Sequence, residues 1–564
     1  MSLALFAVLG VLCIVAVNTA APKVGVSAPL GLMAVGVALS LSRLVPELVV
    51  PPGWILGGVL PLLLYAASVS MPAMDFRRDF RAISGLSVSL VVLSSLALGL
   101  FFSRLVPGLG LAGGIALGAV ISPTDAVATS IVKRLGVAPR AVAVLDGESL
   151  LNDASALVLL RSAIAATAAT VSLWSVARSF AFSIVVATAI GFVVGYGALL
   201  LRRRIPQPTV NTLLSFVVPF LAFEPAEHFE ASGLVAVVTA GILVGHASPR
   251  HLSATHRHND EQNWRTVELL LEGAVFLTMG LQVLPLVEDV QHAQGSVVQA
   301  GVLAAGALTI TIVVRALFVA PLLWTLRRVR QRYESSKARL ETMHERLAEI
   351  DHSGSTPRGQ RQAERNRARV RQVLADADFV ASQPLGARHG VLLVWAGMRG
   401  AITLAAAQTL PADMPYRSLL VLVAFLVAAG SLLLQGATLP RLVRWLGFPP
   451  PDPARREREQ SALAAALEDA GLRALANPEL RQADGTPYDP ETLERLRAKI
   501  LDVFRDPEHG RKRAETTSLG RTLLEAQRTR LLDIRLEGTC SSESLREALA
   551  RVDALQISLE HGSH

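Results

Sequence analysis

Long hydrophobic blocks alternate with short polar connections over the first 445 residues of the chain. A helix that crosses a bilayer needs about 20 mostly hydrophobic residues, and thirteen blocks come close to that length. They centre on residues 2–18, 27–44, 53–70, 83–103, 108–132, 142–166, 176–201, 209–224, 231–246, 266–284, 297–326, 391–411 and 417–445. The pattern therefore predicts an all-α polytopic membrane protein with about 13 transmembrane helices.

Two polar regions interrupt or follow these blocks. Residues 327–390 hold 14 Lys and Arg against 8 Asp and Glu, with helical periodicity in two stretches. We interpret them as a charged cytoplasmic insertion, and binding of lipid headgroups is the alternative. After consecutive prolines at 449–451, residues 455–564 show four amphipathic helical segments and predict a small helical cytosolic C-terminal domain.

Composition agrees with a membrane protein and excludes other classes. Hydrophobic residues make up 51% of the chain and charged residues 18%, below the roughly 25% of soluble domains. Disordered chains are poor in hydrophobic residues, so disorder is excluded as well. The two cysteines, Cys13 and Cys540, cannot build a disulfide framework.

The net charge of +8 is unevenly distributed, because residues 1–449 carry +11 and the remainder is acidic. Basic residues gather in alternate connections, as cytoplasmic connections of membrane proteins do. These connections carry Lys23; Arg77, Arg78 and Arg81; Lys133, Arg134 and Arg140; Arg202–Arg204; Arg250, Arg257 and Arg265; and the segment 327–390. The alternation places the N-terminus outside and the C-terminus in the cytoplasm, and it explains the basic charge without nucleic acid.

The fifth hydrophobic block ends in Ser122-Pro123-Thr124-Asp125. Proline removes a backbone donor and interrupts the hydrogen-bond ladder of a helix. A helix interrupted at membrane depth is tolerated where it lines a cavity or is buried in protein, and such interruptions form the ion sites of transporters. A harmless proline kink is the alternative.

The sixth block places several oxygen-bearing side chains deep in the membrane. Asp153 lies about 18 Å along the helix from its cytoplasmic start, near the centre of a ~30 Å hydrocarbon core. Ser149 shares its face, while Glu148, Asn152 and Ser155 share the adjacent face. Since desolvation disfavours a charged carboxyl group, one group that holds either a proton or a cation provides the minimum chemistry for exchange. A purely structural polar network is the alternative.

Two arginines at membrane depth need partners. Arg399 lies in the twelfth block and Arg315 in the eleventh. We expect Glu148 to pair with Arg399, since an unpaired buried charge costs several kcal/mol, on the order of 3–5. For Arg315 the sequence leaves open a pairing with Glu268 or Glu272.

Four strings in this order resemble a known family. They are Ile121-Ser-Pro-Thr-Asp-Ala-Val127, Gly147-Glu-Ser-Leu-Leu-Asn-Asp-Ala154, Gly397-Met-Arg-Gly-Ala401 and Leu434-Gln-Gly-Ala-Thr-Leu-Pro440. Together they resemble monovalent cation:proton antiporters of the electroneutral NhaP and NHE branch, over roughly residues 1–445.

The resemblance implies thirteen helices arranged as a dimerisation domain and a six-helix core with two crossed broken helices. Asp153 is then the cation and proton carrier, Asn152 is its partner, and Thr124 and Ser149 help Asp153 to bind the transported Na⁺. Asp125 would face the exposed helix ends at the crossing. Glu148 and Arg399 would form the structural ion pair of the core.

Electrogenic relatives carry two acids where this chain has Asn152 and Asp153, together with a lysine inside the membrane. None of the five lysines lies inside a predicted span, so the resemblance implies one-for-one exchange. Tyr65 occupies a position where several relatives have an acid, which leaves Na⁺, K⁺ and Li⁺ open as the cation.

These observations lead to one functional hypothesis and two alternatives. The hypothesis is a homodimeric secondary active antiporter in a bacterial plasma (inner) membrane that exchanges a monovalent cation for H⁺ by alternating access. It implies no cofactor, and its partners are membrane lipids and a second copy of the chain, with no nucleic acid. Residues 1–326 and 391–447 would form the transporter domain, and residues 455–564 a regulatory domain.

The alternatives are a transporter of the same architecture for another small solute, such as an organic anion, and a membrane sensor that signals through its cytosolic tail. An enzyme is not expected, because the spans contain no zinc-binding His-Glu-x-x-His and no nucleophile–base arrangement.

Overall fold

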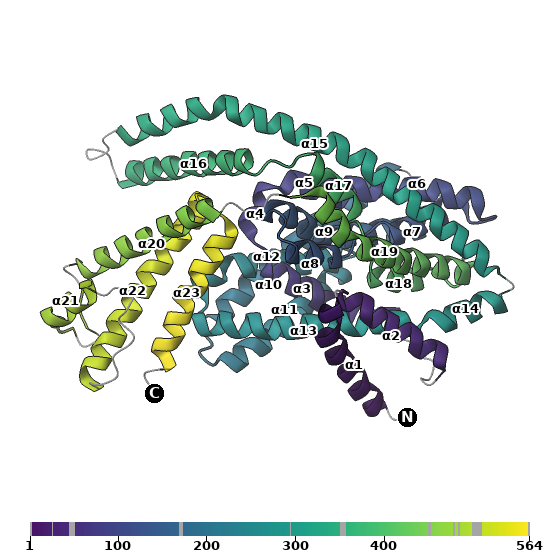
Figure 1. Ribbon diagram of the computed structural model, residues 1–564, viewed down its shortest axis with the longest axis horizontal. Coiled ribbons are helices and arrows are strands. Elements are labelled where there is room, and N and C mark those ends of the chain that lie inside the picture. The colour runs from purple at the N-terminus through teal and green to yellow at the C-terminus, as the bar shows by residue number, and fades with distance from the viewer. Residues whose placement is uncertain are drawn as a thin grey trace. The chain divides into compact units, whose positions relative to one another are not determined.

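A computed structural model describes the chain except for residues 1–2, 25, 44–50, 169–172, 294, 350–356, 449–452, 478–479, 483–484, 499–509 and 562–564. Every regular element in this described part is helical (Figure 1), which confirms the all-α fold class. The chain forms two compact units. The first comprises Met1–His251, Asn259–Leu326 and Leu385–Pro450, and the second comprises Leu252–His258, Arg327–Pro384 and Pro451–His564.

The hydrophobic blocks become the helices of the first unit. In chain order these are α1 (Leu3–Val24), α2 (Ala28–Ser42), the π-helix η1 (Trp54–Val59), α3 (Leu60–Ser70), α4 (Ala73–Arg78), α5 (Phe80–Ser84), the π-helix η2 (Gly85–Ser89), α6 (Leu90–Leu105), α7 (Gly110–Ile121), α8 (Val127–Arg134), α9 (Pro139–Ala168), α10 (Leu173–Arg202), α11 (Pro208–His228), α12 (Gly233–His251), α13 (Ala254–Leu281), α14 (Val283–His292), α15 (Val297–Glu349), α17 (Ala387–Trp395), α18 (Ala401–Gln408) and α19 (Arg417–Leu446). The first residues of α13 and the last residues of α15 belong to the second unit.

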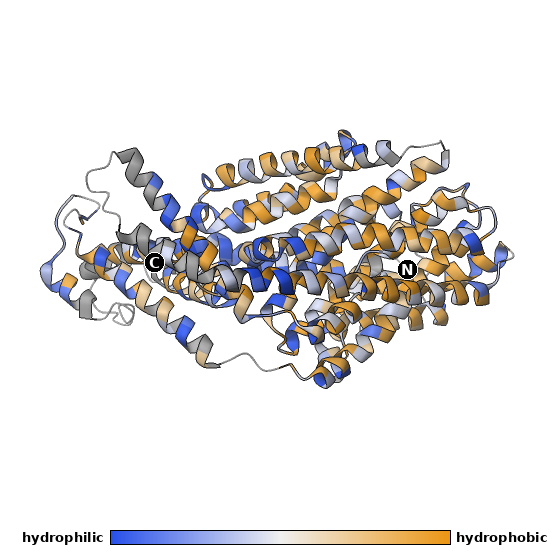
Figure 2. Ribbon diagram, turned by 90° about the horizontal axis from the view of Figure 1, so that it is seen from above, coloured by the Kyte–Doolittle hydropathy of each residue, from blue (hydrophilic) through white to orange (hydrophobic). Residues whose placement is uncertain are grey.

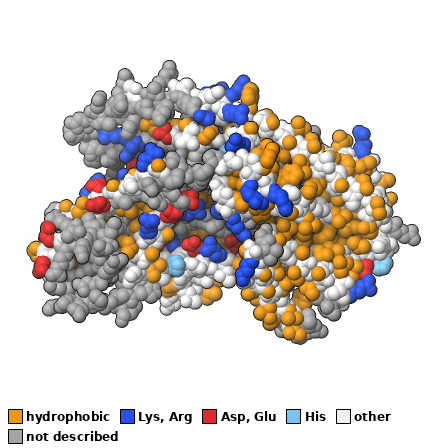
Figure 3. Space-filling view, viewed as in Figure 1, with side chains coloured by type: hydrophobic (Ala, Val, Ile, Leu, Met, Phe, Trp, Pro, Cys, Tyr) orange, Lys and Arg blue, Asp and Glu red, His pale blue; other side chains and the backbone are white. Residues whose placement is uncertain are grey.

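Nine helical stretches in the described residues are long and hydrophobic enough to cross a membrane, and α2, η1–α3 and α7 are shorter hydrophobic helices. Hydrophobic residues dominate the ribbons of this unit (Figure 2) and cover much of the face shown in Figure 3. Trp174 and Leu317, for example, are 79% and 71% exposed. Such an extensive exposed hydrophobic surface is what a lipid-facing protein needs. The chain is therefore a multi-pass membrane protein, while the count of thirteen helices stays a prediction.

Helices pack closely where glycines remove side chains from the contact. α7 lies against α6, and a Cβ atom on Gly114 or Gly118 would overlap backbone oxygens of Gly99 or Ser95. Glycines four residues apart thus create the smooth face along which two helix backbones approach. This packing holds the C-terminal end of α7, where the helix is interrupted, in a fixed place.

Two helices of the first unit are interrupted, and the interruptions meet. α7 ends at Ile121 and α8 begins at Val127, while α17 ends at Trp395 and α18 begins at Ala401. The backbone N–H of Asp125 donates to the carbonyl oxygen of Met398 at 2.7 Å. The predicted pair of crossed broken helices is confirmed by this contact.

The second unit contains α16 (Pro357–Ser382), α20 (Pro453–Leu475), α21 (Pro490–Ala498), α22 (Gly510–Glu537) and α23 (Ser542–His561). α20, α22 and α23 share a small hydrophobic core around Leu463, Leu524 and Leu531. α16 packs against α22, where Arg371 and Glu537 form an ion pair at 3.0 Å. The insertion and the tail, which appear as separate polar regions in the sequence, therefore fold together.

Candidate functional site

Asp153 lies on α9 and is buried, with 4% of its surface exposed. Its carboxyl group forms no hydrogen bond or ion pair with any residue that the structure describes. A buried carboxylate without a partner is costly as a free anion. Asp153 is therefore suited to hold either a proton or a bound cation.

Asn152 connects α9 to the interruption between α7 and α8. Its Nδ2 donates to Thr124 Oγ1 at 2.6 Å and to the Thr124 carbonyl oxygen at 3.3 Å. The Thr124 hydroxyl in turn donates to Glu148 Oε1 at 3.2 Å. Because the Thr124 carbonyl can only accept, this chain of bonds fixes the orientation of the Asn152 amide.

Glu148 pairs with Arg315 of α15, and not with Arg399 as we expected from the sequence. Arg315 Nη2 lies 2.7 Å from Glu148 Oε2, and Arg315 Nη1 bonds Glu148 Oε1. Arg315 Nε also donates to the Leu393 carbonyl oxygen at 2.6 Å. The parallel, two-bond contact explains the choice, because a guanidinium group binds a carboxylate best when both lie in one plane. Glu268 and Glu272, the two open candidates for Arg315, are therefore not its partners.

Arg399 instead stabilises helix ends. Its Nε donates to the carbonyl oxygen of Ile121, the last residue of α7, at 3.1 Å, and its Nη1 bonds the Gly397 carbonyl oxygen. A helix C-terminus carries a partial negative charge, so a cation is favourable there. These carbonyls are free because both helices are interrupted, which is why Arg399 needs no carboxylate.

Asp125 lies at the helix N-termini of the same crossing. Its Oδ1 accepts from the N–H of Val127, the first residue of α8, at 3.1 Å. Its carboxyl group also lies directly against Gly400, the residue before α18. Anions are stabilised at helix N-termini. Asp125 therefore compensates the partial positive charge of the helix N-termini, and Arg399 compensates the partial negative charge of the helix C-termini.

We expect Gly400→Ala to destabilise the protein, because the added Cβ atom would overlap the Asp125 carboxyl group. Overpacking of this kind costs about 1–3 kcal/mol, which should appear as a lower Tm of the purified protein in detergent. Gly430→Ala is the matched control, since a Cβ atom there meets no atom within 4 Å. Equal Tm values for the two variants would contradict the close contact.

The structure brings most but not all of the predicted site residues together. Asn152, Thr124 and Glu148 form one hydrogen-bonded chain, and Asp125 lies at the crossing that Asn152 contacts through Thr124. The Ser149 hydroxyl donates to the Asp146 carbonyl oxygen of its own helix at 3.1 Å. Its role as a ligand therefore stays a prediction.

Arg140 and Asp79 form a further buried ion pair that the sequence does not predict. Arg140, at the start of α9, contacts Asp79 through Nε and Nη2 at 2.9 and 2.7 Å, and both side chains are almost fully buried. The sequence pattern places Arg140 among the basic residues of a cytoplasmic connection and assigns no role to Asp79. The available signal was weak: Asp79 is the one acid within the basic segment 77–81.

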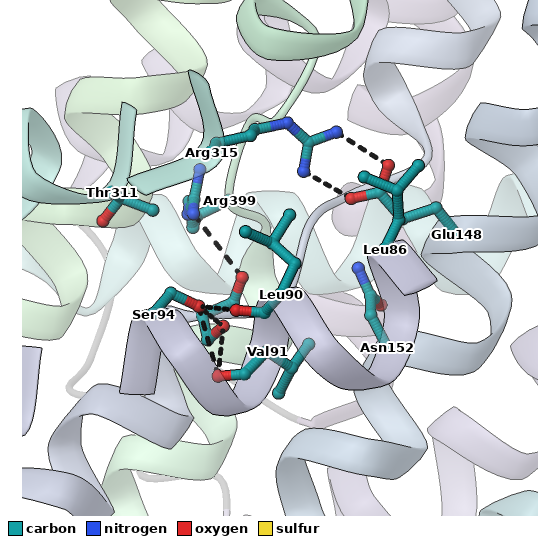
Figure 4. A pocket seen from close by; sticks show the side chains of 10 residues that line it. Leu86, Leu90, Val91, Ser94, Glu148, Asn152, Thr311, Arg315 and Arg399 are labelled. Carbon is teal, nitrogen blue, oxygen red and sulfur yellow. Dashed lines mark hydrogen bonds and ion pairs between the residues drawn. The ribbon is translucent and has the colours of Figure 1, made fainter. Parts of the chain in front are cut away.

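A small cavity lies beside this network (Figure 4). It has room for about one water molecule. Its lining comes from η2, α6, α9, α15 and the two interruptions, and consists of Leu86, Leu90, Val91, Ser94, Ser122, Glu148, Asn152, Thr311, Arg315 and Arg399.

Residues 7–445 match the protein family described as the transmembrane sodium/hydrogen exchangers. The chain belongs to this sodium/hydrogen exchanger family. The resemblance to cation:proton antiporters in the four sequence strings is thereby confirmed, and the family consists of transporters.

Three named relatives show how far the similarity extends along the chain. An uncharacterised Na⁺/H⁺ exchanger of Mycobacterium tuberculosis is 29% identical over 402 residues, which cover 69% of this chain and 65% of the relative. The chain thus spans about two thirds of that relative's length. The uncharacterised Na⁺/H⁺ exchanger YjcE of Escherichia coli is 28% identical over 89% of this chain and 88% of its own. The Na⁺/H⁺ antiporter NhaP of Pseudomonas aeruginosa is 27% identical over 68% of this chain and 79% of its own.

Among solved structures, the fold is similar to that of the sodium proton antiporter MjNhaP1 of Methanocaldococcus jannaschii. The TM-score is 0.54 at 15% sequence identity, and the match covers 78% of this chain and 98% of that one. At this identity the comparison supports the fold alone.

Proposed function

We propose that the protein is a secondary active antiporter that exchanges a monovalent cation, Na⁺ in the first instance, for H⁺. The observation that carries the proposal is the buried Asp153 carboxyl group, which has no protein partner in the described structure and lies beside two crossed helix interruptions. A carboxylate in that setting binds a proton or a cation, but not both at once. Alternating exposure of this one group to the two sides of the membrane couples the two flows.

The same geometry supports a choice of cation ligands. Asp153 supplies the charge, and Thr124 supplies a hydroxyl oxygen that donates to Glu148 and accepts from Asn152. A hydroxyl oxygen has two lone pairs, so one of them stays available to a cation. We propose Ser149 as a further ligand, which requires its hydroxyl to turn away from its own helix.

The charge balance favours one-for-one exchange. Asn152 is neutral, so the pair of Asn152 and Asp153 offers one titrating carboxyl group to one cation. Lys23 and Lys133 lie in the last turns of α1 and α8, away from the interior of a span. One Na⁺ then replaces one H⁺, and no net charge crosses the membrane.

The names of the relatives support Na⁺ as the cation that is exchanged for H⁺. Pseudomonas aeruginosa NhaP and NhaH of Halobacillus dabanensis are both named Na⁺/H⁺ antiporters. We extend that activity to this chain. We also propose a homodimer in the bacterial plasma membrane, with the N-terminus outside. Residues 327–390 would be a charged cytoplasmic insertion, and residues 455–564 a cytosolic regulatory domain.

Proton flux in proteoliposomes tests the proposal directly. With purified protein and an internal pH dye, adding external Na⁺ should release internal H⁺, and valinomycin with K⁺ on both sides should leave the rate unchanged if exchange is electroneutral. Li⁺ and K⁺ measured in the same way give the cation preference, and choline is the control. Proton movement that depends on the anion and not on the cation would contradict the proposal.

The pH dependence should show competition between H⁺ and the cation. If both bind Asp153, each unit of pH below the midpoint of proton binding should raise the apparent KM for Na⁺ about tenfold, with little change in maximal rate. The factor reflects the mass action of one proton, about 1.4 kcal/mol per pH unit. A maximal rate that falls while KM stays constant would show that the proton acts elsewhere.

A further inference from the structure

We propose that the small cavity beside Asn152 binds one ordered water molecule, through which Arg399 positions the Asn152 amide. This inference rests on the proposed function, since it assigns a positioning residue to the proposed cation site. It is built on three features: an acceptor, a set of donors and a space of matching size.

The acceptor is Asn152 Oδ1. Its amide nitrogen is committed to Thr124 by two hydrogen bonds, so the oxygen must point away from that residue. Oδ1 is buried and finds no donor among the residues that the structure describes. Leaving such a group without a hydrogen bond costs about 1–3 kcal/mol, which a bound donor would remove.

The donors belong to Arg399, which is 2% exposed. A guanidinium group has five N–H bonds, and its bonds to the carbonyl oxygens of Ile121, Gly397 and Ser122 use three of them. Two N–H bonds therefore remain on a side chain that lines the same cavity as Asn152. A water molecule that accepts a hydrogen bond from Arg399 and donates one to Asn152 Oδ1 gives both groups a hydrogen-bond partner.

The cavity suits water better than it suits an ion. Its space corresponds to about one water molecule, and its lining includes Ser94 and Ser122, whose hydroxyl groups bond each other. Two arginines face one glutamate there, which is unfavourable for a cation. A neutral molecule with two donors and two acceptors matches all of these groups.

The consequence concerns the cation site. The Asn152 amide would be held from both ends, by Thr124 on one side and by the water on the other, so its neighbour Asp153 is presented in one orientation. Without the water, Asn152 Oδ1 would stay unsatisfied and the amide would be held by Thr124 alone. Arg399 would thus affect cation affinity without touching the cation.

Thr311 provides a matched pair of variants to test this. Its side chain is 1% exposed and lines the cavity from α15, and its hydroxyl donates only within its own helix, to the Ala307 carbonyl oxygen. Thr311→Ile adds a carbon atom that fills the space, whereas Thr311→Val keeps the volume. We expect Thr311→Ile to raise the apparent KM for Na⁺ about tenfold with a maximal rate within about twofold of the parent, as expected for one lost buried hydrogen bond. Thr311→Val should leave both values unchanged.

A second variant and a structure keep the test decisive. Val91→Ile fills the cavity from α6 and should reproduce the change in KM even if Thr311→Ile folds poorly. A structure at a resolution that shows other buried waters should contain one water between Arg399 and Asn152 Oδ1 in the parent and in Thr311→Val. An empty cavity there, or an unchanged KM in a folded filling variant, would overturn the inference while leaving the antiporter proposal intact. Coupled exchange that survives Asp153→Asn would instead refute the proposed function.

Discussion

Asp153→Asn is expected to abolish coupled cation and proton exchange while the protein stays folded. Asparagine keeps the shape of the side chain, but it cannot release a proton or supply a negative charge to a cation. Since Asp153 has no hydrogen-bond or ion-pair partner in the described structure, replacing it should leave no other group unsatisfied. The measurement is Na⁺-driven proton flux in proteoliposomes, together with the elution profile and Tm of the same preparation.

Asp146→Asn is the matched control, because it makes the same chemical change two turns earlier on α9. The Asp146 side chain is one-third exposed, and its carboxyl group lies 4.0 Å from the Lys133 amino group. Its exchange rate should stay within about twofold of the parent, as expected for a weak surface ion pair. If folded Asp153→Asn retains coupled exchange, the carrier is another group, and Asp125 is the next to test.

Arg315→Leu should cause the largest loss of stability among single changes in the core. Glu148 and Arg315 are each 2% exposed at the side chain, so removing the arginine leaves a buried carboxylate uncompensated. Breaking a buried pair in this way costs about 3–5 kcal/mol, whereas replacing both partners by hydrophobic residues is often neutral. The double variant Glu148→Leu with Arg315→Leu should therefore recover much of the lost Tm and expression.

The same experiment distinguishes Arg315 from Arg399. In a double-mutant cycle, Glu148 and Arg315 should show a large coupling free energy, and Glu148 and Arg399 a small one, because Arg399 bonds carbonyl oxygens at the helix crossing. Exchange activity need not return in the rescued double variant, because Glu148 also accepts from the Thr124 hydroxyl. A rescued fold without transport would separate the structural part of the network from the site.

The sequence alone predicts where the helices lie and where one of them is interrupted. A bilayer requires about 20 hydrophobic residues for each crossing and penalises exposed backbone groups. The position of each helix can therefore be predicted from the composition of its own segment. Pro123 marks the interruption because its effect on the backbone is also local. The structure places that interruption between Ile121 and Val127, as the pattern indicates. Asn152 and Asp153 were identifiable for the same reason, since polar residues in the middle of a hydrophobic helix stand out.

Only the tertiary structure decided which charged groups pair. Glu148 could be assigned an arginine from the sequence, but Arg315 and Arg399 are both buried and basic, and their positions in the chain do not distinguish them. The choice depends on which helix brings a guanidinium group into the plane of the carboxylate, and on which carbonyl oxygens two interrupted helices leave free. The packing of the insertion against α22 and the burial of Arg140 against Asp79 have the same origin. Hydrophobic patterning acts residue by residue along the chain, whereas these contacts depend on the relative placement of helices that lie far apart in it.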